Sequence, residues 1–264
     1  MRASRARPLH SGMAMEGSRM SRPVVVISCS VLQELLGKRL PDGVPAVWLD
    51  IMLHNTPKKL AASIQESIDA IGQPSTIVLG YGLCGNGLVG VKSGVHTLVI
   101  PRTHDCVAIF LGSHQRYVQR FFASPNTYYL TKGWIDARDE PLADYHDYVK
   151  EFDEETADYL FEMKYKHYRK ICLVGFSQQE LDAYRERARA VADFMDQRFG
   201  GVILEETLGS TALIEAMVQR PARPGATDEE FVVIAPGGEI SQELFMRGGE
   251  CVPQPSGRAE KGGG

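Results

Sequence analysis

Apolar residues along this chain fall into short β-branched runs that alternate with longer segments of helical period. The runs predict strands near residues 24–28, 46–50, 76–80, 97–101, 127–131, 170–174, 201–206 and 231–235. The helical patterns lie near residues 30–38, 57–71, 105–123, 142–167, 178–199 and 210–218. Strands that alternate with helices are typical of an α/β protein, so we expect a mostly parallel sheet, or sheets, with flanking helices.

Two of these helices have specific start signals. Thr56 offers a capping hydroxyl directly before Pro57, and proline is well suited to the first position of a helix. Ser177 and Glu180 have the spacing of a capping box, in which each side chain can accept a hydrogen bond from a backbone amide of the first turn.

A weak internal repeat suggests how the chain is organised. The segment 25–35 resembles 171–181, and two further strand-and-turn segments match in the same order. This pattern predicts two related Rossmann-like βα halves, although unrelated βα units also resemble one another because strands are rich in Val and Ile. We expect a disordered leader at 1–22, a first α/β half at 23–131, a bridging segment with a long helix at 132–167, a second α/β half at 168–246 and a disordered tail at 247–264.

Composition narrows the class of protein. The 264 residues are 44% apolar and 23% charged, with a formal net charge of −4. This balance gives no basis for binding nucleic acid or an anionic membrane surface, and we expect neither as a partner. No apolar run has the length of a membrane span. Five cysteines without a secretion signal indicate a reducing compartment, so we expect a cytoplasmic protein with free or metal-bound thiols.

Three of the five cysteines, Cys29, Cys84 and Cys106, each follow a predicted strand. The carboxyl ends of parallel strands meet at one edge of a sheet, where ligands bind, so these thiols can converge in space. With His104 as a fourth ligand, they have the composition of a zinc site, and three cysteines could instead hold a four-iron cluster. The alternative is that the three thiols never meet and bind no metal.

The segments around these cysteines supply further candidates. The turn that contains Cys84 is rich in glycine, which lets backbone amides approach a ligand. For proton transfer at the site the candidates are Tyr81, Asp105 and Glu206, although Asp105 could simply cap the helix that follows. For substrate binding the candidates are Gly85, Asn86, Arg102, Thr207, Gly209, Ser210, Gly237 and Gly238, the last five on turns expected to face the cysteines across a cleft.

The chain resembles a known family through Gly80–Gly87, Pro101–Cys106, Tyr128–Trp134 and Glu206–Ser210. It is a family of bacterial and archaeal proteins of unknown function, often encoded beside corrinoid-dependent methyltransferases. The resemblance covers about residues 23–246 and implies a link with one-carbon metabolism. Cys84, His104 and Cys106 match the family's motifs, whereas Cys29 is a candidate only through its place in the sequence.

These expectations combine into one functional hypothesis with two alternatives. The hypothesis is a zinc-dependent enzyme that transfers an alkyl group to or from a small polar substrate, with a thiol or a corrinoid as the other participant. The first alternative is a non-catalytic accessory protein that binds metal, a corrinoid protein or a methyltransferase. The second is an iron–sulfur lyase or reductase that uses the same three cysteines.

Overall fold

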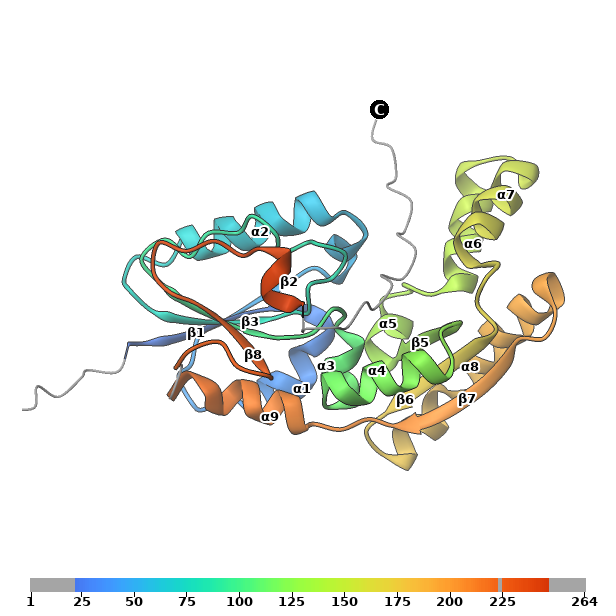
Figure 1. Ribbon diagram of the computed structural model, residues 1–264. Helices are drawn as coiled ribbons and strands as arrows, with labels where there is room; N and C mark the ends of the chain where they lie inside the picture. Colours follow the sequence, from blue (N-terminus) through green and yellow to red (C-terminus); the bar gives the residue numbers. More distant parts are fainter. Residues whose placement is uncertain (1–21, 223–224, 247–264) are drawn as a thin grey trace, which may run out of the picture.

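The structure, a computed structural model, describes residues 22–222 and 225–246. The predicted leader and tail therefore lie outside the described residues, except for Arg22 in the leader, and Cys251 lies outside them too. Within the described ranges the chain forms two sheets flanked by helices, which confirms the predicted α/β class (Figure 1).

The first sheet has five strands in the order β2-β1-β3-β4-β8. The first four run parallel to one another, and β8 pairs antiparallel with β4. Their bounds are β1 Val24–Cys29, β2 Ala46–Leu49, β3 Thr76–Gly80, β4 Thr97–Pro101 and β8 Phe231–Ile234. Cys29 is the last residue of β1, and Cys84 and Cys106 follow β3 and β4, so all three thiols belong to the same edge of the sheet.

The second sheet has three parallel strands in the order β5-β6-β7. They are β5 Thr127–Thr131, β6 Lys170–Gly175 and β7 Ile203–Leu208. The sheets thus cut across the halves expected from the repeat. Strand β5, expected in the first half, pairs with β6, and β8, expected in the second half, pairs with β4 of the first sheet.

Helices cover both faces of the first sheet, with α2 on one side and α1 and α9 on the other (Figure 1). The helices are α1 Gln33–Gly37, α2 Pro57–Asp69, α3 Val107–Leu111, α4 His114–Ala123, α5 Lys132–Asp136, α6 Pro141–Glu151, α7 Glu154–Tyr165, α8 Gln178–Phe199 and α9 Ala212–Gln219. Single 3-10 turns are η1 Ser30–Leu32, η2 Ile51–Asn55, η3 Arg220–Ala222 and η4 Gln242–Phe245. None of the helices in these ranges is long and apolar enough to cross a membrane.

Two predicted helices are each divided in the structure. The helix expected at 105–123 stops at Gly112, which has φ +88° and lies so close to Ser210 that a Cβ would be 2.5 Å from the Ser210 side chain. Ser113 then caps α4 by accepting a hydrogen bond from the Arg116 amide at 3.1 Å. The helix expected at 142–167 is divided at Asp153, whose carboxylate caps α7.

The capping box at α8 is present as the sequence predicts. Ser177 Oγ accepts a hydrogen bond from the Glu180 amide at 3.1 Å. The Glu180 carboxylate accepts one from the Phe176 amide at 3.2 Å, one residue before the expected partner. This pair fixes the start of α8 at the carboxyl end of β6, beside the junction of the two sheets.

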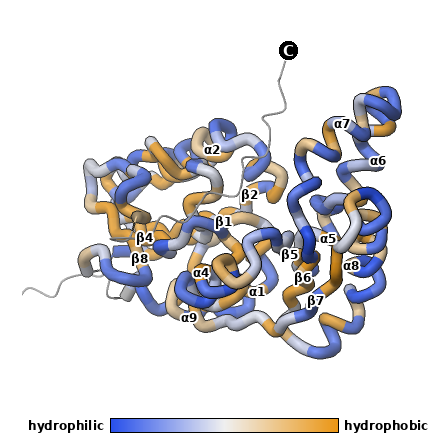
Figure 2. Tube along the Cα trace, turned by 45° about the vertical axis from the view of Figure 1, so that its right-hand side comes forward, coloured by the Kyte–Doolittle hydropathy of each residue, from blue (hydrophilic) through white to orange (hydrophobic). Residues whose placement is uncertain are grey.

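Alternate residues of the second sheet belong to two different apolar clusters. On β6, Ile171 and Leu173 pack with α6, α7 and α8, whereas Cys172 and Val174 pack into the core shared with the first sheet. Figure 2 shows hydrophobic residues gathered on the strands of the first sheet and on β6. Because successive side chains of a strand point to opposite faces, the second sheet joins both cores and holds the two sheets together.

Candidate functional site

The first thiol lies where β1 ends. Cys29 is the last residue of β1 and is only 8% exposed, and η1 starts at the next residue. Burial raises the pKa of this thiol to about 12, with smaller contributions from Cys84, Asp139 and Asp50, while a hydrogen bond from the Val31 backbone opposes the shift. Cys29 is therefore a neutral thiol at physiological pH.

The second thiol lies on a turn with an unusual backbone. Cys84, Gly85 and Asn86 have φ values of 48°, 62° and 68°, so three successive residues take the left-handed conformation. This conformation is uncommon for residues other than glycine, and here it places the Cys84 side chain at the sheet edge. Gly85 and Asn86, two of the residues predicted to bind substrate, are exposed on this turn.

The loop at residues 102–106, which carries Cys106, is bound tightly to this turn. The amides of Leu83 and Cys84 donate hydrogen bonds to the carbonyls of Thr103 and His104, at 2.9 and 3.1 Å. The approach requires glycine at position 82, since a Cβ there would lie 2.7 Å from the backbone of Asp105. The two loops that carry Cys84 and Cys106 are thus held together through their backbones.

The third thiol precedes α3 and contacts the second. Cys106 is partly buried, and a hydrogen bond between its thiol and the Cys84 sulfur is the main reason why the pKa of Cys106 is well above the ordinary value. Burial and the charges of Asp105, Cys84 and Cys29 raise this pKa further. Cys29, Cys84 and Cys106 therefore lie within electrostatic range of one another, and we call them the thiol cluster.

Tyr81 lies among these thiols with its hydroxyl unused. The residue is 3% exposed, and its Oη has no hydrogen-bond partner among the described residues. Burial raises the pKa of this phenol, and Cys29, Cys84 and Cys106 all add to the shift. Burying a hydroxyl without a hydrogen bond destabilises the fold, so a ligand atom bound at the thiol cluster could supply the hydrogen bond that this hydroxyl lacks.

His104 and Asp105 have other contacts in this arrangement. The His104 ring packs against His114, with 5.3 Å between ring centroids, while its carbonyl accepts the Cys84 amide. Asp105 Oδ1 accepts a hydrogen bond from the Val107 amide at 2.8 Å, which is the capping alternative expected from the sequence. Throughout residues 22–222 and 225–246, no group of three or more His, Cys, Asp or Glu side chains is arranged as a metal site. The thiol cluster thus brings three sulfur atoms near one another, but the described side chains do not have the geometry of a metal site.

Asp139, which lies beside His54, is a neighbour of the thiol cluster that was not predicted from the sequence, whereas His54 was a second-rank candidate for substrate contact or proton transfer. Asp139 is 2% exposed, contributes to the raised pKa of Cys29, and has its Oδ2 3.2 Å from His54 Nε2. The sequence offers one signal for Asp139, the acidic pair Asp139-Glu140 before Pro141. Of this pair, Glu140 caps α6, whereas Asp139 lies against His54. Only the positive φ of 58° at Arg138, which no sequence pattern marks, turns Asp139 into the interior.

The turn after β7 lies beside α3, and Glu206 on β7 is already paired. The Ser210 amide donates to the Phe110 carbonyl at 3.0 Å, and Gly209 lies against the same carbonyl. Glu206 accepts two hydrogen bonds from Arg185, at 2.6 and 2.8 Å, which lower the pKa of the carboxyl. Glu206 is therefore an ionised partner of α8, and Thr207 follows it along β7.

Gly237 and Gly238 lie at the other edge of the first sheet. Strand β8 is antiparallel to β4, so the residues that follow Ile234 lie beyond Leu98, at the amino end of β4. The Gly237 amide donates to the Gly94 carbonyl at 2.7 Å, and the Ser93 amide donates to Gly238. The expectation that this turn faces the cysteines assumed a parallel strand, and the antiparallel pairing removes its basis.

Arg102 binds the polypeptide backbone. Its guanidinium donates hydrogen bonds to the carbonyls of Asp228, Leu244 and Met246, at 3.1, 2.8 and 2.8 Å. These bonds attach the segments before and after β8 to the end of β4 and account for an arginine at this position.

A cleft of about 450 Å³ lies beside the thiol cluster, between the carboxyl ends of the two sheets. Ser30 and Val31 line it from the first sheet, directly after Cys29. Thr131 and Lys132 line it from the end of β5, and Phe176 from the end of β6. A volume of this size is typical of small-molecule sites.

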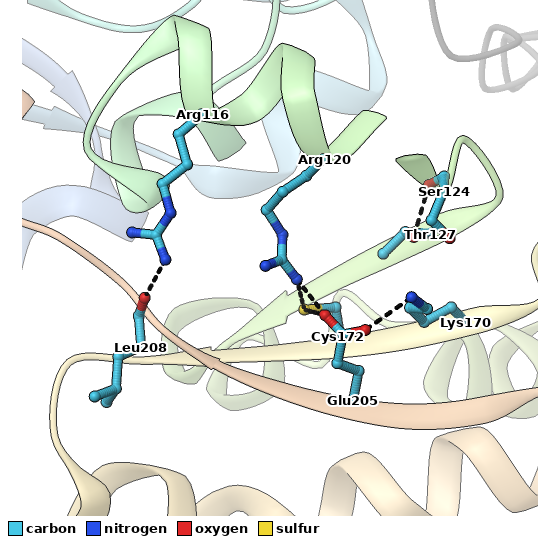
Figure 3. Close-up of polar contacts among 8 residues, drawn as sticks. All are labelled: Arg116, Arg120, Ser124, Thr127, Lys170, Cys172, Glu205 and Leu208. Atoms are coloured by element: carbon cyan, nitrogen blue, oxygen red, sulfur yellow. Dashed lines mark hydrogen bonds and ion pairs between the residues drawn. The ribbon is translucent and has the colours of Figure 1, made fainter. Parts of the chain in front are cut away.

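The fourth described cysteine lies in a different setting on the second sheet. The Arg120 guanidinium of α4 donates to Cys172 Sγ at 3.4 Å and also pairs with Glu205 of β7 (Figure 3). Lys170 binds the other oxygen of Glu205 at 2.7 Å. We call these four residues the arginine cluster. Two cations thus surround the carboxylate, and Cys172 is a fully buried residue of the core.

Comparison with known proteins gives a family and no function. No curated protein and no solved structure matches the chain. Residues 48–217 match a family described as "Protein of unknown function (DUF1638)", and this match covers more than half of the chain and includes Cys84 and Cys106. The chain belongs to the DUF1638 family of proteins of unknown function.

Proposed function

We propose that the protein is a metal-dependent enzyme whose thiol cluster binds one zinc ion, and which transfers an alkyl group to or from a small polar substrate. The observation that carries the proposal is the convergence of Cys29, Cys84 and Cys106 around a buried tyrosine hydroxyl that no described residue binds. Three sulfur donors beside an open cleft are the chemistry of a catalytic zinc site, in which one position is left for substrate.

The electrostatics of the cluster support a cation as its occupant. Burial is the main reason why the pKa of Cys29 is raised, and the hydrogen bond with Cys84 is the main reason for Cys106, while neighbouring thiols and carboxyls add to both shifts. Zinc binds thiolates and favours their deprotonation, so metal and proton compete for the same sulfurs. Because the described side chains are not arranged as a formed metal site, binding requires the three thiols to reorient and release protons.

Each residue has a distinct part in this proposal. Cys84 and Cys106 supply the two sulfurs already in contact, and Cys29 the third. The Tyr81 hydroxyl would donate a hydrogen bond to one of the sulfurs or to a bound substrate atom. Zinc, when bound, would lower the pKa of a substrate thiol and make it a nucleophile for an alkyl group. His104, which packs against His114, is the less favoured fourth ligand.

The choice of alkyl transfer rests on the resemblance described above rather than on geometry. A family encoded beside corrinoid-dependent methyltransferases would supply or accept a methyl group. A methylcorrinoid or its carrier protein is accordingly the proposed partner, and the cytoplasm the proposed location.

The test is metal analysis of protein purified without oxygen. We expect about one zinc per chain in the native protein, loss of that zinc in Cys84→Ser, and retention in Cys172→Ser, the matched control from the arginine cluster. Zinc added to metal-free protein should also release protons, in numbers that fall in Cys84→Ser. Activity is then assayed with thiols and methylcorrinoid.

The other outcomes are equally specific. Iron with sulfide in place of zinc would replace this proposal with the iron–sulfur enzyme. Zinc without turnover, together with a stable complex with a methyltransferase, would indicate the accessory protein. Absence of metal binding in the native protein, or equal binding by Cys84→Ser, would overturn the metal site.

A further inference from the structure

The cleft between the two sheets carries an excess of negative charge. Among the residues that line it, Glu34, Asp136 and Glu180 are acidic and Lys132 is the one basic residue. Lys132 lies 2.7 Å from Asp136 and 3.5 Å from Glu34, so one ammonium serves two carboxylates. Exposed Lys38, outside the lining, pairs with Glu34 at 2.7 Å, and even with this charge the acidic residues are in excess.

One polar group in the lining is buried without a partner. Thr131 is 2% exposed, lines the cleft, and has no hydrogen-bond partner for its Oγ1 in the part of the chain that the structure describes. It occupies the cap position of α5, where a threonine commonly accepts a hydrogen bond from a helix amide, yet here it caps nothing. Its hydroxyl is left for something that enters the cleft.

The remaining wall is aromatic and aliphatic. Phe110 and Phe176 line the cleft with 6.3 Å between their ring centroids, and Val31, Leu35 and Ile51 complete the apolar part. Aromatic rings attract cations through the negative charge of their faces, and they do so best beside carboxylates and away from water. The wall is therefore suited to a group that is apolar and positively charged at once.

We propose that this cleft binds a small organic cation, an ammonium group that carries a short alkyl substituent. The alkyl part lies on Phe110 and Phe176, and the nitrogen lies toward Asp136 and Glu34. The Thr131 hydroxyl accepts a hydrogen bond from an N–H of the ligand. The proposal goes beyond the zinc site and requires no metal, although Ser30 at the cleft wall directly follows Cys29 and places such a ligand near the thiols.

The first experiment compares three ligands of one shape. Isothermal titration calorimetry is run on the full chain with n-butylammonium, n-butanol and butyrate. We expect binding of n-butylammonium, at least about tenfold weaker binding of butanol, and weaker binding still of butyrate, because the carboxylates repel it. Equal binding of all three would reduce the site to an apolar pocket, and failure of n-butylammonium to bind would overturn the proposal.

Two variants then locate the site. Asp136→Asn removes a charge, and Thr131→Val removes the hydroxyl while keeping the shape of the side chain. Each should weaken n-butylammonium binding about tenfold, whereas Glu66→Gln, an exposed carboxylate on α2, should leave it unchanged. Since Thr131→Val removes a buried group without a partner, it should not lower the melting temperature.

The pattern of variant results is decisive in either direction. Loss of binding in both cleft variants, with normal melting temperatures, supports the proposal. Equal weakening by Glu66→Gln would show attraction to the net charge of the protein and not to the cleft. Because binding is measured on protein whose metal content is determined separately, failure here leaves the zinc proposal standing, and failure of the zinc proposal leaves this one testable.

Discussion

Cys29 and Cys172 are both buried at or within parallel strands, yet their surroundings differ. In the arginine cluster, Cys172 receives a hydrogen bond from Arg120, and Glu205 is neutralised by Arg120 and Lys170. In the thiol cluster, Cys29 is near two further thiols, Asp139 and a tyrosine hydroxyl without a partner. One set has cations beside its thiol and carboxylate, although Arg120 Nε has no partner among the described residues, whereas the electrostatic neighbours of Cys29 are a thiol and two carboxyls.

This difference separates a structural thiol from a candidate functional one. Buried polar groups are almost always satisfied, so unsatisfied ones indicate where a ligand is expected. A raised thiol pKa alone does not make the distinction, because burial raises the pKa of Cys172 to about 11 as well. The two sites differ in the charges around the thiol. Arg120 and Lys170 balance Glu205 beside Cys172, whereas Asp139 and Asp50 add negative charge near Cys29.

The largest loss of stability is expected when the loops that carry Cys84 and Cys106 are forced apart. In Gly82→Ala the new Cβ would lie 2.7 Å from the backbone of Asp105, so one loop must move. We expect a loss of about 2 to 3 kcal/mol in the free energy of unfolding, measured by urea denaturation. Gly72→Ala is the control, because its Cβ would meet no atom within 4 Å. Similar small costs in both variants would contradict the close approach.

A smaller loss should follow when charge compensation is broken in the arginine cluster. Arg120→Met keeps much of the side-chain length but leaves Cys172 without its donor and Glu205 with Lys170 alone. We expect a cost of about 1 to 3 kcal/mol in the free energy of unfolding. Lys58→Met removes an exposed charge from α2 and should change stability by less than about 0.5 kcal/mol. An equal effect of both substitutions would mean that the cluster contributes little.

Alkaline pH should then reveal the thiol cluster. The folded-state pKa of Cys29 is raised from 9.0 to about 12, so the neutral thiol stabilises the fold fully below pH 9.0 and this contribution decreases as the pH rises toward 12. Within this pH range, one such thiol lowers the free energy of unfolding by up to about 1.4 kcal/mol for each pH unit.

The comparison of native protein with Cys29→Ala isolates this contribution. We expect the difference in their free energies of unfolding to shrink by about 1 kcal/mol between pH values of roughly 8 and 10. Denaturant titrations at both values check it, with Cys172→Ala as the second variant, whose window ends near its own pKa of about 11. Parallel profiles for native protein and Cys29→Ala would contradict the raised pKa.

The smallest effect concerns a single hydroxyl. Tyr81→Phe removes an oxygen that has no partner among the described residues, so we expect unchanged stability or a gain of up to about 1 kcal/mol, measured by thermal unfolding. Tyr165→Phe is the matched control, since its hydroxyl lies 2.6 Å from Asp144 and its loss should cost about 1 kcal/mol. A clear loss of stability in Tyr81→Phe would show that its hydroxyl is already satisfied.

Local sequence patterns were sufficient to predict where the strands lie and where two of the helices start. β-branched runs placed all eight described strands to within two residues, and Thr56-Pro57 and Ser177 marked true helix starts. Neither the division at Gly112 nor the one at Asp153 was predicted from the sequence. Gly112 is explained by its contact with Ser210, far along the chain, which no local pattern contains.

The sequence by itself determined that Cys29, Cys84 and Cys106 follow parallel strands, and hence that they share one sheet edge. Only the tertiary structure decided that there are two sheets, that β8 runs antiparallel and takes Gly237 to the opposite edge, and that Asp139 turns toward Cys29. The physical reason is the range of the interactions. Strand and helix periods arise between near neighbours, whereas strand pairing and charge compensation depend on residues brought together from distant parts of the chain.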